Sequence, residues 1–375
     1  MEYTTFGNTG YKVSKLGFGA MRLPMIDVNG EKAIDDEKAI PLMQRAFDLG
    51  VNYIDTAPYY CDKLSEIAVG KALKGYRDKV YVSTKNPIED ISGDNWLKRL
   101  ENSLKQLDTD YIDFYHFWGI GLEGFNSWQG QKFGPIEAAR KAKEQGLIKH
   151  ISFSYHDDAK NMPAIIDSGL FESVLVQYNL LDRSNEENLA YAASKGLGVV
   201  VMGPVGGGRL GAPSPVIQGL LKDKVKSTAE VAMRFVLANP NAHISLSGMS
   251  TMEQLEENVE IASRSGHLTD EEKVRVGEMM AENRKLAELY CTSCDYCMPC
   301  PVNINIPHIF NIMNNHKVYE ITEHAKGQYK EVIDGTGWVK SADATKCTEC
   351  GACEAKCPQK LPIIKQLKDT HAALA

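Results

Sequence analysis

The stretch "DDEKAIPLMQRAFDLGVNYIDTA", residues 35–57, contains the unit that decides the fold of this chain of 375 residues. In residues 35–50 the apolar side chains recur at the spacing of an amphipathic helix, and the segment ends in glycine. Residues 51–57 form a short apolar run that is typical of a buried strand. This stretch therefore predicts one helix and the strand that follows it.

The same alternation continues along most of the chain. Residues 95–108 and 134–146 repeat the helical pattern. Apolar runs typical of strands occupy residues 15–20, 51–57, 79–85, 111–118, 147–154, 173–179, 198–204 and 243–248. Eight strands, each followed by a helix or a long loop, predict an α/β fold of the (β/α)8 barrel type. A doubly wound open sheet is the alternative that this pattern leaves open.

Two further segments frame the barrel sequence. Residues 2–13, "EYTTFGNTGYKV", predict a hairpin with Asn8, Thr9 and Gly10 in its turn, and we expect it to close the barrel floor. Residues 268–290 predict a long helix with Thr269 as its N-cap. We divide the chain accordingly into a barrel domain, residues 1–285, and a small, mostly helical domain, residues 286–375.

The composition excludes several classes of protein. The net charge of −7 gives no sign of a nucleic-acid partner or of binding to an anionic membrane. The N-terminus lacks the apolar core of a signal peptide, and no apolar run is long enough to span a bilayer. We therefore expect a cytoplasmic protein.

Cysteines are concentrated at the end of the chain. Of nine cysteines, only Cys61 precedes the two runs "CTSCDYCMPCP", residues 291–301, and "CTECGACEAKCP", residues 347–358. Disulfides are rare in the cytoplasm, so metal ligation is the favoured interpretation. The second run has the spacing of bacterial ferredoxins, whereas the first has two residues rather than three before Cys300. We predict a ferredoxin-like domain with two [4Fe-4S] clusters, and a pair of four-cysteine zinc sites is the alternative.

The ferredoxin rule also assigns the ligands. In two-cluster ferredoxins the fourth cysteine of each run ligates the other cluster. By this rule one cluster is held by Cys291, Cys294, Cys297 and Cys357. The other is held by Cys300, Cys347, Cys350 and Cys353.

Polar side chains follow two neighbouring strands of the predicted barrel, where catalytic groups of such barrels lie. Asp55 ends the strand at 51–57, Tyr60 lies in the following loop, and Lys85 ends the strand at 79–85. A nearby lysine lowers the pKa of a phenol toward use as a general acid, and an aspartate holds that lysine charged. The three residues predict a site for proton transfer.

Four stretches resemble motifs of the aldo-keto reductase family. They are "LGFGAMRLP" at 16–24, "GVNYIDTAPYYCDKLSE" at 50–66, "VSTK" at 82–85 and "GMSTMEQLEENV" at 248–259. The resemblance covers roughly residues 3–265, and the tail is similar to the subgroup that carries a ferredoxin-like domain. It implies hydride transfer between a nicotinamide and a carbonyl group, with Tyr60 as proton donor and with Asp55 and Lys85 tuning it.

The fourth catalytic group of that family is a histidine, and the chain departs from the family there. Trp118 stands at the histidine position, and His116 lies two residues earlier on the same face of the strand. Tryptophan donates one hydrogen bond but cannot shuttle protons. This change favours substrates beyond simple ketones, such as conjugated double bonds, or a flavin in the barrel.

The resemblance also implies cofactor contacts. It assigns Ser154 and Gln177 to the nicotinamide carboxamide, and Glu257 and Asn258 to the adenine. "GPVGGGRL", at 203–210, follows the seventh strand, where barrels bind phosphate. Its expected phosphate contacts are Gly203, Pro204, Gly206, Gly207 and Gly208, and the same site suits FMN.

The choice between NADH and NADPH stays open. Gly248 and Gln254 stand where NADP-binding relatives carry a lysine and an arginine. Those basic side chains pair with the 2′-phosphate.

Three functions fit these features. In the first, the protein is an oxidoreductase for a small organic substrate, and its clusters exchange electrons through a flavin or with a ferredoxin- or flavodoxin-like carrier. In the second, it is a nicotinamide-dependent aldo-keto reductase whose clusters are purely structural. In the third, it is a non-catalytic nicotinamide or redox sensor.

Overall fold

The structure of the protein is a computed structural model that describes residues 1–221, 225–291, 296–357 and 360–375. The chain divides into two compact units. The first comprises Met1–Pro204 and Ala232–His267, and the second comprises Val205–Val231 and Leu268–Ala375. The segment that follows the seventh barrel strand in the chain therefore belongs to the second unit.

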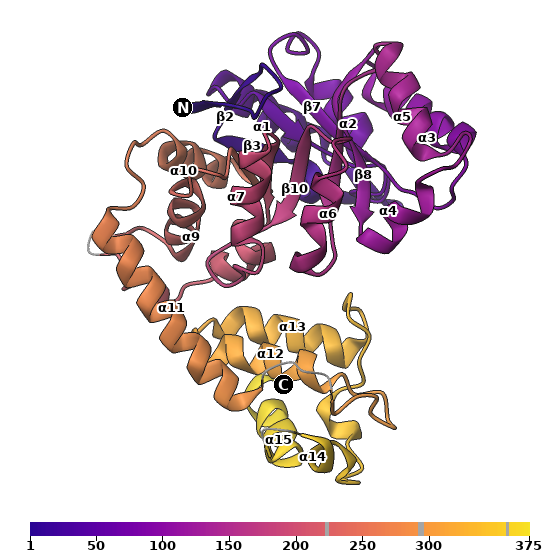
Figure 1. Cartoon of the computed structure of the whole chain (residues 1–375). Coiled ribbons are helices and arrows are strands. Elements are labelled where there is room, and N and C mark those ends of the chain that lie inside the picture. Colours follow the sequence, from indigo (N-terminus) through magenta and orange to yellow (C-terminus); the bar gives the residue numbers. More distant parts are fainter. Residues whose placement is uncertain (222–224, 292–295, 358–359) are drawn as a thin grey trace. The chain divides into compact units, whose positions relative to one another are not determined.

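Eight parallel strands of the first unit close into a barrel (Figure 1). In pairing order they are β10 (Ser173–Gln177), β11 (Gly198–Met202), β12 (Ile244–Ser247), β3 (Leu16–Gly19), β6 (Tyr53–Asp55), β7 (Tyr81–Asn86), β8 (Ile112–Ile120) and β9 (Ile148–Tyr155). Strand β9 pairs with β10 and completes the ring. The predicted (β/α)8 fold is confirmed, and the open-sheet alternative is wrong because the sheet has no free edge.

Helices alternate with these strands along the chain. They are α1 (Asp36–Asp48), α2 (Ser65–Ala72), α3 (Gly93–Leu107), α4 (Leu122–Trp128), α5 (Pro135–Glu144), α6 (Met162–Ile166), α7 (Glu186–Ser194), α8 (Pro215–Gln218), α9 (Thr228–Leu237) and α10 (Met252–Ala262). Helix α3 illustrates the local cause: the Ser92 side chain caps it by accepting a hydrogen bond from Asn95 N, and Trp96, Leu100 and Leu107 are buried along one face. The three helical patterns expected at 35–50, 95–108 and 134–146 are confirmed.

The first hairpin closes the barrel floor as expected. Strands β1 (Tyr3–Thr5) and β2 (Lys12–Ser14) pair antiparallel. Phe6, between them, is fully buried, and its ring lies 5.0 Å from that of Phe114 and 6.1 Å from that of Tyr53. These aromatic contacts seal the interior on the side opposite to the carboxyl ends of the strands.

A second hairpin, which the strand pattern did not predict, follows β3. Strands β4 (Met25–Val28) and β5 (Glu31–Ile34) pair antiparallel around a turn at Asn29 and Gly30. Both turn residues have positive φ, which suits asparagine followed by glycine. The dipeptide was a usable local signal, but the strands are largely exposed and lack a clear apolar alternation.

The second unit is mostly helical, as predicted. Its helices after residue 268 are α11 (Asp270–Tyr290), α12 (Ile306–Lys317), α13 (Thr322–Asp334), α14 (Ala352–Lys356) and α15 (Ile363–Leu374). Thr269 and Glu272 cap α11 reciprocally, because each side chain accepts the other residue's backbone N–H, at 3.2 and 2.9 Å. The core of the unit contains Ile309, Phe310, Tyr329 and Leu367 from α12, α13 and α15.

The segment Val205–Val231 is tied to these helices. The Ser214 hydroxyl donates a hydrogen bond of 2.6 Å to the carbonyl of Tyr319, and the Arg275 guanidinium donates one of 3.0 Å to the carbonyl of Gly219.

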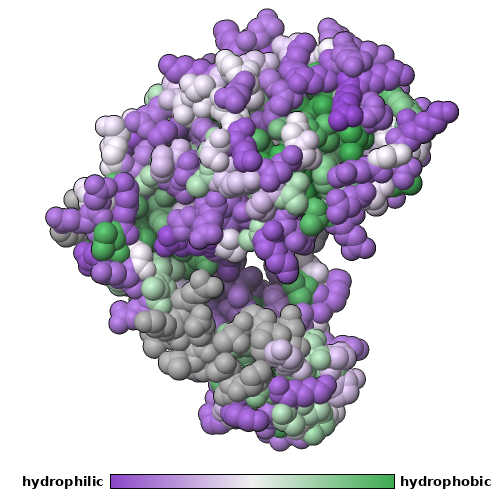
Figure 2. Space-filling model, viewed as in Figure 1, coloured by the Kyte–Doolittle hydropathy of each residue, from purple (hydrophilic) through white to green (hydrophobic). Residues whose placement is uncertain are grey.

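Among the described residues, no helix combines the length and apolarity needed to cross a membrane. The face of the molecule shown in Figure 2 is mostly hydrophilic, with apolar side chains in scattered patches.

Candidate functional site

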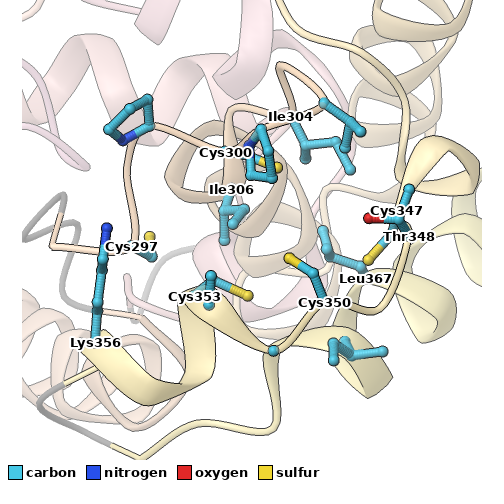
Figure 3. Close-up of a pocket in the computed structure, with 16 residues that line it drawn as sticks. Cys297, Cys300, Ile304, Ile306, Cys347, Thr348, Cys350, Cys353, Lys356 and Leu367 are labelled. Carbon is cyan, nitrogen blue, oxygen red and sulfur yellow. The ribbon is translucent and has the colours of Figure 1, made fainter.

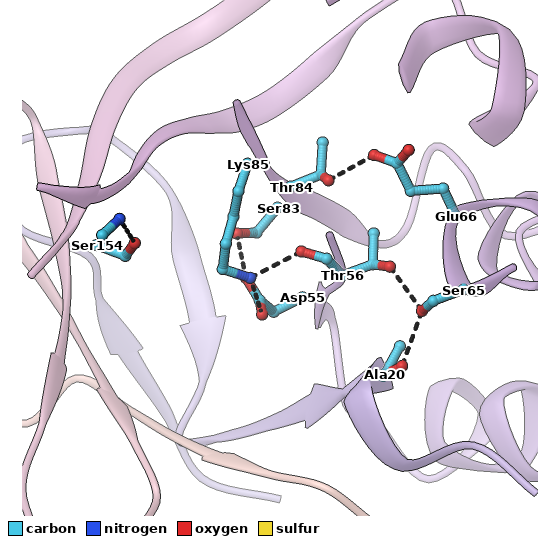
Figure 4. A network of polar contacts seen from close by, with 10 residues as sticks. Ala20, Asp55, Thr56, Ser65, Glu66, Ser83, Thr84, Lys85 and Ser154 are labelled. Carbon is cyan, nitrogen blue, oxygen red and sulfur yellow. Dashed lines mark hydrogen bonds and ion pairs between the residues drawn. The ribbon is translucent and has the colours of Figure 1, made fainter. Parts of the chain in front are cut away.

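Asp55 and Lys85 form a buried ion pair at the carboxyl ends of two neighbouring strands. Asp55 is the last residue of β6, and Lys85 lies near the end of β7. The Lys85 ammonium donates to Asp55 Oδ2 at 2.6 Å and to the carbonyl of Thr56 at 2.7 Å (Figure 4). Ser83 donates to the other carboxylate oxygen at 2.8 Å. Both charges are therefore held in one geometry, away from solvent.

Tyr60 lies beside this pair. The Lys85 ammonium is 4.6 Å from the centre of the Tyr60 ring. The three residues that follow Tyr60, Cys61, Asp62 and Lys63, all have φ between 51° and 71°. Consecutive left-handed non-glycine residues are strained, and surrounding contacts must hold them in place. The fold thus brings together Asp55, Tyr60 and Lys85, which the sequence analysis proposed as a set.

A hydrogen-bond network that the sequence analysis missed anchors the loop that carries Tyr60. Thr56 and Ser65, near its two ends, share a hydrogen bond of 2.7 Å, and Ser65 also donates to the carbonyl of Ala20 (Figure 4). Thr84, the residue before Lys85, donates to Glu66 at 2.6 Å, and Glu66 is fully buried. Helix α2 is therefore fixed to the outer face of β7 while Lys85 occupies the inner face. The sequence signal for this contact was an acidic residue, Glu66, in the first turn of a helix with several buried apolar residues.

The electrostatics of Tyr60 differ from the expectation. Burial raises the pKa of the Tyr60 phenol, and the positive charge of Lys85 offsets only part of that rise. Burial by itself lowers the pKa of Lys85, but the charge of Asp55 and the neighbouring Tyr60 outweigh it and raise that pKa above its ordinary value. Tyr60 therefore holds its proton at neutral pH, and Lys85 remains a cation.

Trp118 and His116 lie at different depths. Trp118 is half-buried. Its ring contacts that of Tyr60 edge to face, with 5.9 Å between the ring centres, and its ring centre lies 5.4 Å from that of Tyr59. His116 is fully buried and pairs in register with Lys85 across the two strands. Neither of its ring nitrogens has a hydrogen-bond partner among the described residues. Burial, together with the nearby Lys85 charge, lowers the pKa of His116 to about 3.

The residues expected to contact the nicotinamide lie on β9 and β10. Ser154 is buried, and its hydroxyl accepts a hydrogen bond of 2.7 Å from the backbone N–H of Gly119 (Figure 4). Gly203 has a φ of 65°, and a Cβ there would lie 2.7 Å from the Gln177 amide oxygen. The positive φ favours glycine at this position, and the Gln177 side chain lies close beside it at the end of β11.

The segment expected to bind phosphate is divided between the two units. Gly203 and Pro204 end the first part of the barrel unit, whereas Gly206, Gly207 and Gly208 belong to the second unit. The latter three have φ values of 60°, 68° and 102°, which favour glycine.

The loop after β12 carries the residues expected near the adenosine. Gln254 accepts a hydrogen bond of 2.8 Å from the backbone N–H of Ser250, and Asn258 donates one of 3.1 Å to Ser247. A Cβ at Gly248 would meet the Arg22 side chain at 3.7 Å, and Ser250 donates to the carbonyl of Arg22 at 2.6 Å. The Arg22 side chain therefore lies beside Gly248, the position at which the resemblance implies a lysine in NADP-binding relatives.

Cysteines of both runs line one pocket of the second unit. Figure 3 shows Cys297 and Cys300 from the first run together with Cys347, Cys350 and Cys353 from the second. Most other lining residues are apolar. Cys357 is buried in the core of the unit, and Cys291 packs against that core. Cys294 lies outside the described residues.

The convergence of these cysteines is loose. Among the residues that the structure describes, no three His, Cys, Asp or Glu side chains gather as they would around one metal ion. The assignment of cluster ligands therefore rests on the cysteine spacing and on the shared pocket.

Comparisons with known proteins identify two matching families. Residues 15–279 match the model of the "Aldo/keto reductase family", and residues 290–361 match that of a "4Fe-4S dicluster domain". L-galactose dehydrogenase of Arabidopsis thaliana is 32% identical over 291 residues, which cover 69% of this chain and 87% of that protein. Pyridoxine 4-dehydrogenase of Escherichia coli is 27% identical over 287 residues, covering 72% and 96%.

Solved structures agree with these matches. The holo form of an aldo-keto reductase from Bacillus halodurans is 29% identical and superposes with a TM-score of 0.64. The likeness covers 74% of this chain and 96% of that one.

The low pKa of His116 predicts an acid-sensitive barrel. In the unfolded chain His116 titrates near its ordinary pKa of about 6.5, whereas in the fold it stays neutral down to about pH 3. Between these values the unfolded state binds the extra proton, so stability falls as pH falls. Below pH 6, the unfolding free energy of the wild type should therefore fall by up to about 1.4 kcal/mol more per pH unit than that of the His116→Leu variant, which lacks the imidazole.

Denaturant unfolding at several pH values, followed by circular dichroism, measures this difference. The His316→Leu variant, altered in the second unit, controls for the loss of any histidine. Parallel pH profiles of the wild type and His116→Leu would contradict the prediction.

Proposed function

The chain belongs to the aldo/keto reductase family of oxidoreductases and carries a 4Fe-4S domain, and from this premise we propose a function for its two parts. The barrel, residues 1–285, reduces or oxidises a small carbonyl or conjugated substrate with NAD(P)H. The cluster domain, residues 286–375, exchanges electrons with the barrel or with a carrier protein, in the cytoplasm. The observation that carries the proposal is the Asp55–Lys85 ion pair beside Tyr60.

In this proposal Tyr60 is the proton donor. Its raised pKa keeps the phenol protonated at neutral pH, so the donor carries its proton before the reaction begins. When bound, the nicotinamide supplies the hydride. As the phenol loses its proton, the neighbouring Lys85 cation stabilises the phenolate, and Asp55 holds Lys85 in place.

In this proposal Trp118 lines the site with an aromatic indole, where the family has a histidine. The indole meets Tyr60 edge to face and offers a single N–H donor. An aromatic face favours flat, conjugated substrates as well as simple carbonyls. His116, neutral and buried beside Lys85, lies too deep to replace the missing imidazole at the surface of the site.

The residues present fit a nicotinamide nucleotide. Gly203 leaves room for the Gln177 amide at the end of β11, and Ser154 lies near the end of β9, which pairs with the strand β10 that ends in Gln177. We propose that these two side chains hold the carboxamide. Glu257 and Asn258 would contact the adenine, and the N–H groups of Gly206, Gly207 and Gly208 would face phosphate.

Removal of the Tyr60 hydroxyl tests the catalytic assignment. We expect Tyr60→Phe to lower kcat/KM by about 10²-fold or more with small aldehydes, ketones and enones, because a general acid contributes about that much. Tyr59→Phe is the matched control, since the exposed Tyr59 hydroxyl bonds to Glu89 instead. Steady-state rates with NADPH and NADH measure both. Full activity of Tyr60→Phe would remove Tyr60 from the mechanism.

Arg22 supports a preference for NADPH. It lies over Gly248, where the resemblance would put a basic side chain, and we propose that it pairs with the 2′-phosphate. Arg22→Gln should weaken NADPH binding about tenfold and leave NADH binding nearly unchanged. Arg45→Gln, whose guanidinium faces Glu256 at 3.8 Å, is the control. Binding titrations by nicotinamide fluorescence decide, and equal losses for both nucleotides would contradict this role.

The donor set of the second unit fits two [4Fe-4S] clusters. Cys300, Cys347, Cys350 and Cys353, which form one set of proposed ligands, line one pocket, and Cys297 of the other set lines it as well. Cys357, proposed for the other cluster with Cys291, Cys294 and Cys297, is buried outside that pocket's lining. When bound, such clusters accept and release single electrons.

The role of the clusters has two candidates. Because a nicotinamide exchanges two electrons and a cluster one, we propose an FMN or an external ferredoxin- or flavodoxin-like carrier as the intermediary. The other candidate is a structural role. It is favoured by the packing of Cys291, Cys297, Cys300, Cys347 and Cys353 against the apolar core of the unit.

An anaerobic titration separates these roles. We expect the visible absorption of the reconstituted protein to bleach when NADPH is added, because electrons pass from the barrel to the clusters. Iron, sulfide, zinc and flavin contents are measured on the same sample. Absorption that dithionite bleaches and NADPH does not would favour structural clusters or a different electron donor.

A further inference from the structure

We propose that Lys356 supplies a positive charge that raises the reduction potential of the cluster bound in the cysteine pocket. This inference rests on the proposed clusters. Among the described residues that line the pocket, Lys356 is the one that carries a charge. The other lining residues are five cysteines and a set of apolar or small side chains: Pro299, Pro301, Val302, Ile304, Ile306, Thr348, Gly351, Ala352, Ile364 and Leu367.

The position of Lys356 is set by α14. This helix ends at Lys356, between Cys353 on its first turn and Cys357 directly after it. In Figure 3 the Lys356 side chain extends along the pocket on the Cys297 side, away from Cys347. The chain around the second cysteine run therefore places the ammonium at the side of the pocket, next to Cys297.

Among the described residues, no carboxylate pairs with this ammonium. Two nearby lysines of α15 have acidic partners: Lys365 pairs with Asp369 and Lys368 with Glu349, each at 2.7 Å. Glu354, which shares α14 with Lys356, accepts the backbone N–H of Ile364 at 2.9 Å. Within the described part of the chain, Lys356 itself forms no ion pair. The positive charge of Lys356 therefore acts on the pocket, because no ion-pair partner among the described residues offsets it.

The effect on a cluster follows from its charge. Four thiolates make a [4Fe-4S] cluster anionic, and the uptake of one electron makes it more negative by one unit. A fixed cation stabilises the reduced form more than the oxidised form, and net charge is one of the factors that set cluster potentials. Apolar walls strengthen this interaction, although salt weakens it because Lys356 is exposed. Lys356 therefore makes the cluster a better acceptor of electrons.

The test is a redox titration of the full-length, reconstituted protein at low ionic strength. Dithionite donates the electrons, mediators equilibrate them, and the reduced clusters are followed by electron paramagnetic resonance. We expect both Lys356→Gln and Lys356→Met to lower the equilibrium constant for reduction of one cluster about tenfold, which is about 59 mV for one electron. Lys356→Arg should keep the wild-type potential, and added salt should shrink the difference.

Lys360→Gln is the matched control, because Lys360 is exposed, follows Cys357 by three residues and does not line the pocket. Iron and sulfide contents are measured first for every variant. A wild type without a reducible cluster would overturn the cluster assignment and this inference together. Loaded variants whose potentials equal that of the wild type, or a control that shifts as far as Lys356→Gln, would overturn the role of Lys356 alone.

Discussion

The buried pair of Lys85 and Asp55 is the interaction on which the barrel site depends. Both side chains are almost completely removed from solvent, and loss of one partner would leave an uncompensated charge that costs about 3–5 kcal/mol. The carbonyl of Thr56 and the hydroxyl of Ser83 complete the hydrogen bonding. Because the pair joins β6 to β7 at their carboxyl ends, it fixes a cation beside Tyr60 without any rearrangement.

The same burial that makes the pair strong also changes what Tyr60 can do. A phenol removed from water holds its proton more tightly, and Lys85 counteracts this only in part. In the proposed mechanism, Tyr60 donates its proton and Lys85 then stabilises the anion that remains. Trp118, whose ring contacts that of Tyr60, would supply aromatic surface to the proposed site rather than a second proton carrier.

In the second unit, several of the proposed cluster ligands are also part of the packing. Cys291, Cys297, Cys300, Cys347 and Cys353 pack on the core formed by α12, α13 and α15, so metal binding there would stabilise the unit as well as equip it for redox reactions. The segment Val205–Val231 belongs to this unit although it lies between barrel strands in the chain. The glycine run 206–208 therefore lies between barrel strands β11 and β12 in the sequence but belongs to the cysteine-containing unit in the structure.

Local patterns in the sequence determined much of this protein. The order of strands and helices, the Asn8–Gly10 turn, the Thr269 cap and the cysteine spacing all depend on residues a few positions apart, where periodicity and capping rules apply. Only the tertiary structure decided the Glu66–Thr84 contact, the position of Arg22 over Gly248, the raised pKa of Tyr60 and the line between the two units. These features arise from burial and from contacts between distant segments, which no local spacing encodes.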